Sequence, residues 1–253
     1  MRKIAFLAVT AFVLVAATVA YAAQVNQYTV SGSTQPKAKG SAKSPKPIGI
    51  KFGFSVAEAS GNRPAVVEKY VIKFGGTKVT PSVAAKCSKS TLDSKGPSGC
   101  PSKSIVGSGF IENETGATNN EADKSIQCNA ALSVVNLGSN NASIYVQGDP
   151  NQTDPRRKCA IQLAAGIPAK FRNTTAGSEL SFVVPESLRH PGSPGISNAV
   201  KKVSSTIKRI TKDGKGFYNA VGGCKSNGKR TVTVTFRTEA GKTDRVNKLV
   251  PCS

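Results

Sequence analysis

Alternation of apolar and polar residues is the main pattern along this chain. The clearest run occupies residues 48–56, where every second side chain is apolar and glycine, lysine or serine lies between. Successive side chains of a strand point to opposite faces, so this run predicts a strand with one buried face. The same pattern recurs at residues 70–74, 180–184 and 232–236. The expected core positions are Ile48, Ile50, Phe52, Phe54, Val56, Tyr70, Ile72, Phe74, Leu180, Phe182, Val184, Val232, Val234 and Phe236.

Two pairs of alternating runs are joined by turn residues. Residues 229–238, KRTVTVTFRT, lead through Glu-Ala-Gly-Lys into a second run that ends at residue 250. This arrangement predicts a C-terminal hairpin. Residues 125–137 and 142–147 flank Gly-Ser-Asn-Asn, in which Gly and Asn tolerate positive φ. A second hairpin is expected there.

Residues 200–210 allow two interpretations. Val200, Val203, Ile207 and Ile210 are spaced three, four and three apart, which would place them on one side of a basic amphipathic helix. The tract is also rich in β-branched residues, and the Asp-Gly pair at 213–214 is a two-residue turn signal. The second observation favours a strand.

Many short strands separated by Gly, Pro and Asn turns indicate an all-β fold. We expect an antiparallel β-sandwich with disulfides, built as one domain or as two packed β subdomains. The sandwich should span residues 48–253, with a strongly basic C-terminal part. Residues 23–47 should hold a short strand near residues 28–30 and a basic flexible loop or linker, because residues 35–47 contain four lysines and no apolar side chain larger than alanine.

The N-terminus has the parts of an export signal. Arg2 and Lys3 precede an apolar run over residues 4–19, and Ala-Tyr-Ala at 20–22 has the small residues that a signal peptidase requires. Residues 1–22 are therefore predicted to be a signal peptide, with an uncleaved anchor as the alternative. The other apolar stretches are strand-sized, so no membrane span is expected after cleavage. We expect a secreted or extracytoplasmic protein that can associate with the cell surface.

The cysteine count is even, and export favours disulfides. Pairing between neighbours along the chain closes short loops that suit the predicted strands. A zinc site is the alternative, but it is disfavoured because the chain has no CxxC pair and one histidine. The expected pairs are Cys87 with Cys100, Cys128 with Cys159 and Cys224 with Cys252.

Charge is the most distinctive feature of the composition. The chain has 35 Lys and Arg against 14 Asp and Glu, a formal charge of +21. Such a positive charge favours binding to anionic cell-wall polymers or lipid headgroups. The alternative is a solvated basic face that binds no specific partner. Nucleic acid is a weaker candidate because no recognition motif is present. The predicted polyanion-binding residues are Lys201, Lys202, Lys208, Arg209, Lys212 and Lys215.

Acidic residues gather in one loop-like stretch. Glu112, Glu114, Glu121 and Asp123 could supply oxygen ligands to a calcium ion. A solvated acidic loop is the alternative, because the full ligand pattern of a calcium loop is missing. No other cofactor is expected.

Candidate catalytic residues are few. His190 is the only histidine, and no GxSxG elbow accompanies it, so no catalytic residue is assigned. Paired carboxylates could hydrolyse glycosides without histidine, but the spacing selects no pair. The candidates for such a pair are Glu58, Glu112, Glu114, Glu186 and Glu239.

Three parts of the chain resemble exported β-rich proteins of actinobacteria. They are Cys100-Pro101 with the Ser-Ile-Val-Gly-Ser-Gly run at 104–109, the stretch from Val184-Pro185 to His190-Pro191, and the C-terminal hairpin with Cys252. The resemblance implies export and β structure, and no activity is assigned to these proteins. The expected function is a non-catalytic exported β protein that binds anionic surface polymers at the cell envelope. The alternatives are a secreted carboxylate-dependent hydrolase and a calcium-dependent adhesion module.

Overall fold

Antiparallel strands form most of the protein. The computed structural model describes residues 24–159, 163–192 and 195–252, so the predicted signal peptide lies outside the described residues. The strands are β1 (Asn26–Gln35), β2 (Lys46–Glu58), β3 (Val67–Gly75), β4 (Thr77–Val79), β5 (Ile105–Ala117), β6 (Ile126–Gly138), β7 (Asn141–Gly148), β8 (Ala164–Thr174), β9 (Gly177–Val183), β10 (Ile196–Ile207), β11 (Thr211–Lys212), β12 (Lys215–Gly216), β13 (Tyr218–Ala220), β14 (Lys229–Thr238) and β15 (Thr243–Pro251). The α-helices are α1 (Lys89–Lys95) and α2 (Glu186–Arg189), and short 3-10 turns occupy Pro81–Val83, Pro97–Gly99, Ser102–Ser104 and Pro155–Arg157.

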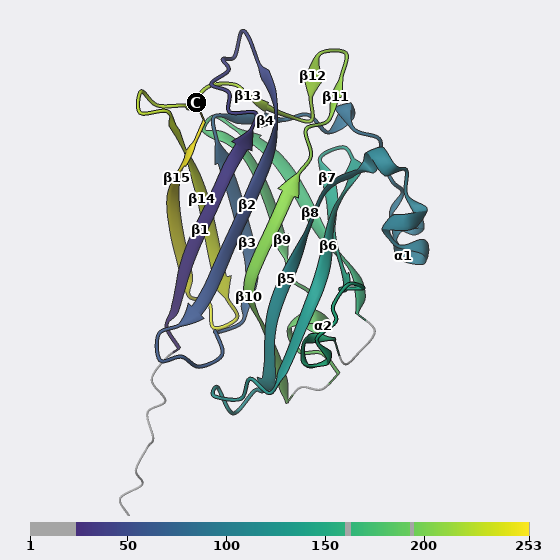
Figure 1. Ribbon diagram of the computed structural model, residues 1–253, viewed down its shortest axis with the longest axis vertical. Helices are drawn as coiled ribbons and strands as arrows, with labels where there is room; N and C mark the ends of the chain where they lie inside the picture. The colour runs from purple at the N-terminus through teal and green to yellow at the C-terminus, as the bar shows by residue number, and fades with distance from the viewer. Residues whose placement is uncertain (1–23, 160–162, 193–194, 253) are drawn as a thin grey trace, which may run out of the picture.

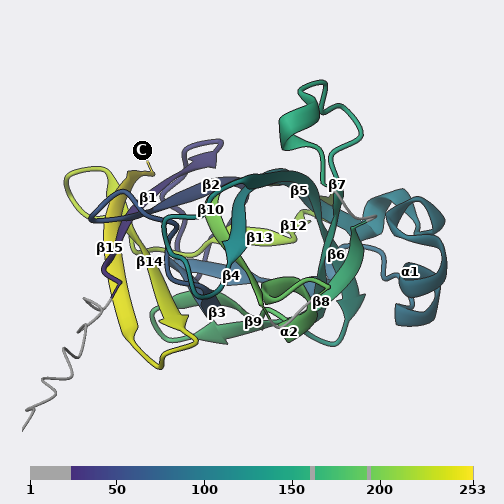
Figure 2. The same ribbon diagram turned by 90° about the horizontal axis from the view of Figure 1, so that it is seen from below.

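One large antiparallel sheet contains all strands except the β11–β12 hairpin. Its order is β15-β14-β3-β9-β8-β7-β6-β5-β10-β2-β13-β4, and β1 pairs with β2. The sheet folds back on itself, so that β1, β2, β10 and β5 face β14, β3, β9 and β8 (Figures 1 and 2). Strands β6 and β7 connect the two layers on one side. The predicted all-β sandwich is confirmed.

The core lies between these layers. Phe54 of β2 packs against Tyr70 of β3 and Phe236 of β14, with ring centroids 5.5 and 5.3 Å apart. Phe52 meets the ring of Phe74 edge-on at 5.6 Å. Aromatic side chains with this geometry bury large apolar areas and hold the layers in register. The alternating runs predicted as core positions supply these contacts.

Residues 200–207 of the tract that allowed two interpretations belong to strand β10. It pairs with β2 on one edge and β5 on the other. The register against β5 shifts between Val200 and Lys202, which is a β-bulge. The bulge brings Val200 and Val203 to the same inner face at a spacing of three residues, and this irregularity produced the helix-like pattern.

Both predicted hairpins are confirmed, as β14–β15 and β6–β7. Strand β1 pairs with β2 from Asn26 to Gln35, so the basic tract that follows is the connection between two paired strands. No helix within the described residues is long and apolar enough to cross a membrane.

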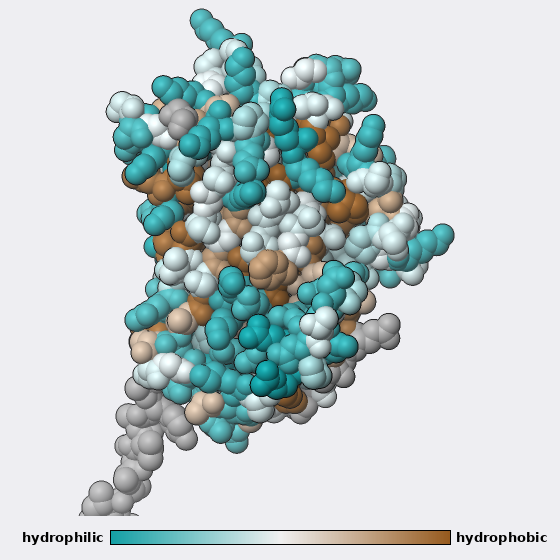
Figure 3. Space-filling model, in the orientation of Figure 1, coloured by the Kyte–Doolittle hydropathy of each residue, from teal (hydrophilic) through white to brown (hydrophobic). Residues whose placement is uncertain are grey.

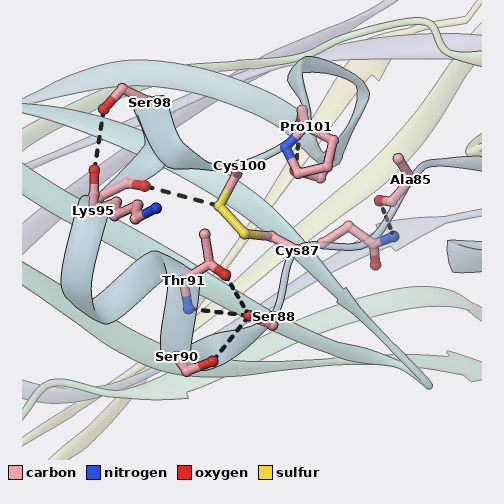
Figure 4. Close-up of a disulfide and its surroundings, with 12 residues drawn as sticks. Ala85, Cys87, Ser88, Ser90, Thr91, Lys95, Ser98, Cys100 and Pro101 are labelled. Carbon is pink, nitrogen blue, oxygen red and sulfur yellow. Dashed lines mark hydrogen bonds between the residues drawn. A yellow bond between two sulfur atoms is a disulfide. The ribbon is translucent and has the colours of Figure 1, made fainter.

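Three disulfides are present in the predicted pairing: Cys87–Cys100, Cys128–Cys159 and Cys224–Cys252. Disulfides are typical of oxidising compartments. The first one holds α1 against the outside of the sheet, where Ser88 caps the helix by accepting the Thr91 N–H at 3.0 Å (Figure 4). The third fastens the base of the C-terminal hairpin.

Candidate ligand-binding cavity

A cavity of about 410 Å³ lies between the two layers. Inward side chains from strands β2, β3 and β5–β10 line it, and nearly all of them are apolar. The lining follows the alternation of each strand, as with Leu132 and Val134 of β6 and Ile144 and Val146 of β7. The sheet therefore encloses a space with a predominantly hydrocarbon surface.

Short side chains at inward positions keep this space open. Ala130 of β6 and Ser205 of β10 both line the cavity, and both have short side chains. The aromatic rings of Phe52, Phe74 and Tyr218 gather on one side of it. Protein interiors are normally packed with few voids larger than a water molecule, so a space of this size is a feature of the fold.

The cavity reaches the surface beside α2. Ser187 of α2 is exposed and Ile126 of β6 is 38% exposed, yet both line the cavity. At the other end, Tyr218 and Val134 are only 1% and 3% exposed. We call the α2 end the mouth and the Tyr218 end the floor.

Polar contacts hold the α2 segment over the mouth. Asn198 Nδ2 donates to the Leu188 carbonyl at 2.8 Å, and its Oδ1 accepts from the Thr115 hydroxyl. His190 Nδ1 lies 3.0 Å from the Ile196 carbonyl oxygen. These contacts attach α2 to β10 and, through Asn198, to β5, so they fix the position of α2 at the mouth.

An ion cluster joins the same segment to the β14–β15 turn. Arg189 pairs with Glu239, and its Nε also donates to the Val184 carbonyl at 3.0 Å. His190 Nε2 lies 2.8 Å from Glu239 Oε1. Both nitrogens of the only histidine therefore face oxygen atoms in structural contacts. This arrangement gives His190 a positioning role at the mouth.

Two buried polar atoms of the cavity-lining residues have no hydrogen-bond partner within the described part of the chain. They are the hydroxyl of Tyr70 and Oδ1 of Asn113. Tyr70 is 2% exposed and Asn113 is 7% exposed. Burial, together with nearby Tyr28, raises the pKa of Tyr70, so the phenol stays neutral. Buried polar atoms without partners are rare because each costs about 1–3 kcal/mol.

The predicted calcium residues do not meet at one centre. Glu112 pairs with Lys202 at 3.0 Å and Glu114 with Lys201 at 2.7 Å. The Asp123 carboxylate accepts the Ala117 N–H at 2.7 Å, which lowers the pKa of Asp123 to about 2. Among the described residues, no three His, Cys, Asp or Glu side chains are grouped to hold a metal ion.

Arg63 is the residue that organises this acidic loop, and sequence reasoning missed it. Its guanidinium is 3% exposed and donates to the backbone carbonyls of Ala117, Asn120 and Asp123. The turn between β5 and β6 is thus built around a buried cation.

The other acids proposed for hydrolysis also have structural contacts. The Glu58 carboxylate accepts backbone N–H groups from Ser60 at 2.7 Å and Asn62 at 3.2 Å, which lower the pKa of Glu58 against an opposing effect of burial. Glu239 is held by Arg189 and His190. Glu186 is exposed at the start of α2. None of the described residues that line the cavity carries a carboxylate.

The predicted basic group divides into two parts. Lys201 and Lys202 lie on β10 and pair with acids of β5. The other four lie beyond the end of β10 and on the β11–β12 hairpin, at the end of the molecule opposite the mouth (Figure 1). All four are exposed, and they are Lys208, Arg209, Lys212 and Lys215.

No protein-family model matches this sequence, and no curated protein matches it.

Proposed function

We propose that this protein is a non-catalytic, exported binding protein that holds an apolar small molecule in its cavity. The observation that carries the proposal is the cavity itself. Its 410 Å³ falls in the range of roughly 300–1,000 Å³ that small-molecule sites occupy. The export-like N-terminus and the three disulfides support an extracytoplasmic location.

Energetics support an occupant for this space. A hydrocarbon chain of about fourteen methylenes would gain roughly 11 kcal/mol on burial. After an association cost of at least ~4 kcal/mol, the remainder corresponds to a Kd on the order of 10 μM.

Titration with an uncharged fluorescent apolar probe, Nile red, tests the proposal. Filling the cavity should weaken binding in proportion to the added volume, so we expect a modest loss in Ala130→Leu and at least a tenfold loss in Ala130→Phe. Ala131 lies on the same strand and faces away from the cavity, so Ala131→Leu and Ala131→Phe are matched controls that should bind like wild type. Circular dichroism checks that each variant folds, because overpacking costs about 1–3 kcal/mol. Absence of saturable binding by the wild-type protein would refute the proposal.

A second candidate function is attachment to anionic polymers of the cell surface, favoured by charges that the fold brings to one end. The connection from β1 to β2 carries Lys37, Lys39 and Lys43, and Gly40 forms a bridge with Val221 close to β13. That connection and the β11–β12 hairpin both extend from the upper end of the molecule (Figure 1), where hydrophilic side chains crowd the surface (Figure 3).

Retention on an anionic polymer across a salt series tests this attachment. With Lys208, Lys212 and Lys215 replaced by Gln, retention on polyphosphate resin should be lost at lower salt, because fewer counterions are released. Replacing Lys89, Lys95 and Lys103 by Gln gives a control with the same loss of charge near α1. Equal elution of both triple variants would show that only net charge matters.

A further inference from the structure

An open groove crosses the outer face of the sheet over strands β3, β14 and β15. Its volume is about 580 Å³. Part of its lining is backbone without side chains, at Gly75, Gly76 and Gly223. Two chain segments approach closely there, because a Cβ added at Gly76 would lie 2.1 Å from the Gly222 carbonyl oxygen. The hollow is therefore set by the backbone of the sheet and its turns.

The charged side chains that line this groove are all cations. They are Lys73 of β3 and Arg245 and Lys248 of β15, and no carboxylate belongs to the lining within the described ranges. Lys73 Nζ lies 3.7 Å from Glu179, which is outside the lining. Arg245 and Lys248 are exposed and have no ion-pair partner in the described part of the chain. Two of the three positive charges are thus free to meet an anion.

The neutral polar groups of the groove add hydrogen-bond donors. The Thr233 hydroxyl donates to Asn247 Oδ1 at 2.7 Å. This bond occupies the acceptor of the amide, whereas its Nδ2 hydrogens have no partner among the described residues. Lysine and arginine side chains are donors only. A groove with these groups is complementary to a ligand rich in acceptors and negative charge.

Resting on the proposed attachment to anionic surface polymers, we infer that this groove holds the polymer chain through its phosphate or carboxylate groups. Arg245 and Lys248 are three residues apart on β15, about 10 Å along the strand. Lys73 lies level with Asn247, two strands and about 10 Å across the sheet. Successive oxyanions of a chain can reach all three cations, whereas a single small anion would require three long side chains to converge.

The position of the groove agrees with this assignment. Its lining includes Leu249, near the C-terminal end of β15. That end of the strand lies at the upper end of the molecule, as does the β11–β12 hairpin with its exposed lysines (Figure 1). The hairpin can therefore attract a polyanion toward the end of the molecule where the groove binds it.

Short oligomers test the groove separately from attachment to a long polymer. Pentapolyphosphate, trigalacturonate and the neutral maltotriose would each be titrated calorimetrically into the wild-type protein at low salt. We expect an anionic oligomer to bind and maltotriose not to bind, and the oligomer that binds identifies phosphate or carboxylate as the source of the oxyanion. Failure of both anionic oligomers while polyphosphate resin still retains the protein would overturn the inference and leave the attachment intact. Failure on the resin as well would overturn both.

Two double substitutions assign the binding to the groove. Arg245→Gln with Lys248→Gln removes its two unpaired cations, and at a factor of about three for each exposed ion pair the affinity for the anionic oligomer should fall about tenfold. Lys69→Gln with Lys170→Gln removes the same charge from exposed positions on the same face of the sheet, outside the groove. This control should bind like wild type. Equal losses in the two variants would show that only net charge matters and would overturn the inference, and the wild-type series decides the ligand class even where a variant fails to fold.

Discussion

Removing disulfides one at a time separates stability from ligand binding. The two most informative are Cys87–Cys100, which holds α1 outside the sheet, and Cys128–Cys159, which lines the cavity. Each pair would be replaced by alanine. Both variants should be less stable than wild type, but only the second should change the binding of an apolar probe.

The loop that each disulfide closes sets the expected loss of stability. The bridges span 13 and 31 residues of sequence. The chain-entropy relation then gives about 3 kcal/mol for the first and about 3.7 kcal/mol for the second. At ~2–4 °C per kcal/mol for a chain of this size, either variant should melt roughly 6–15 °C lower.

The location of each bridge sets the expected effect on binding. Cys87 and Cys100 belong to a small separate cluster with Leu92, Val135 and Tyr145, none of which lines the cavity. Releasing this cluster should free α1 and leave the cavity unchanged. Releasing Cys128 from Cys159 frees the segment before β8 from β6 and removes part of the cavity wall.

Urea unfolding and Nile red titration of the same samples measure the two effects. The Cys87→Ala/Cys100→Ala variant should bind the probe within about twofold of wild type, and the Cys128→Ala/Cys159→Ala variant should bind several-fold more weakly. Loss of probe binding by the folded first variant, or wild-type affinity in the second, would contradict the expected roles of the two disulfides.

Two further predictions concern the backbone around the sheet. Hydrogen bonds lower the pKa of Asp123 to about 2, so the stability that its carboxylate contributes to the fold is present above pH 4 and is lost as the pH falls through 2. The difference in unfolding free energy between wild type and Asp123→Asn, measured by urea unfolding, should therefore shrink from pH 4 to pH 2. A constant difference would contradict this prediction. Gly76 has φ of +61°, and a Cβ there would lie 2.1 Å from the Gly222 carbonyl oxygen. The Gly76→Ala variant should therefore lose more stability than the ~1–2 kcal/mol that the left-handed conformation alone costs. Gly241 has φ of +81° and open space around the position that a Cβ would take, so Gly241→Ala should lose only that amount.

Local patterns were sufficient to predict much of the fold. Alternation identified β2, β3, β9 and β14 because each has one face in the core, and turn residues identified the β6–β7 and β14–β15 hairpins. The disulfide pairing followed from loop length. The tract at 200–210 was ambiguous because a bulge shifts its inward positions by one residue, and only the neighbouring strands reveal the bulge.

The cavity could not be predicted in the same way. Inward positions are visible in the sequence, but the distance between opposing layers depends on how the sheet folds back. Asn113 and Thr115 show the difficulty, because they fall on the inner face within a stretch that contains four acids. Sequence alone assigned that stretch to a solvated loop or a calcium site. Glu112 and Glu114 pair with Lys202 and Lys201 on the outer face, and the alternation of side chains along β5 turns Asn113, which lies between these two acids, inward.

The two proposed binding surfaces lie at opposite ends of the molecule, and this separation has a consequence for how they would work together. The exposed lysines of the β1–β2 connection and the β11–β12 hairpin extend from the upper end in Figure 1, whereas α2 and the mouth lie at the lower end. A protein held to an anionic surface by the upper end would direct its mouth away from that surface. Ligand would then enter from the surrounding medium, because the polymer would not cover α2. Saturating polyphosphate should therefore leave the affinity for Nile red unchanged, and competition between the two would show that the polymer binds close to the mouth.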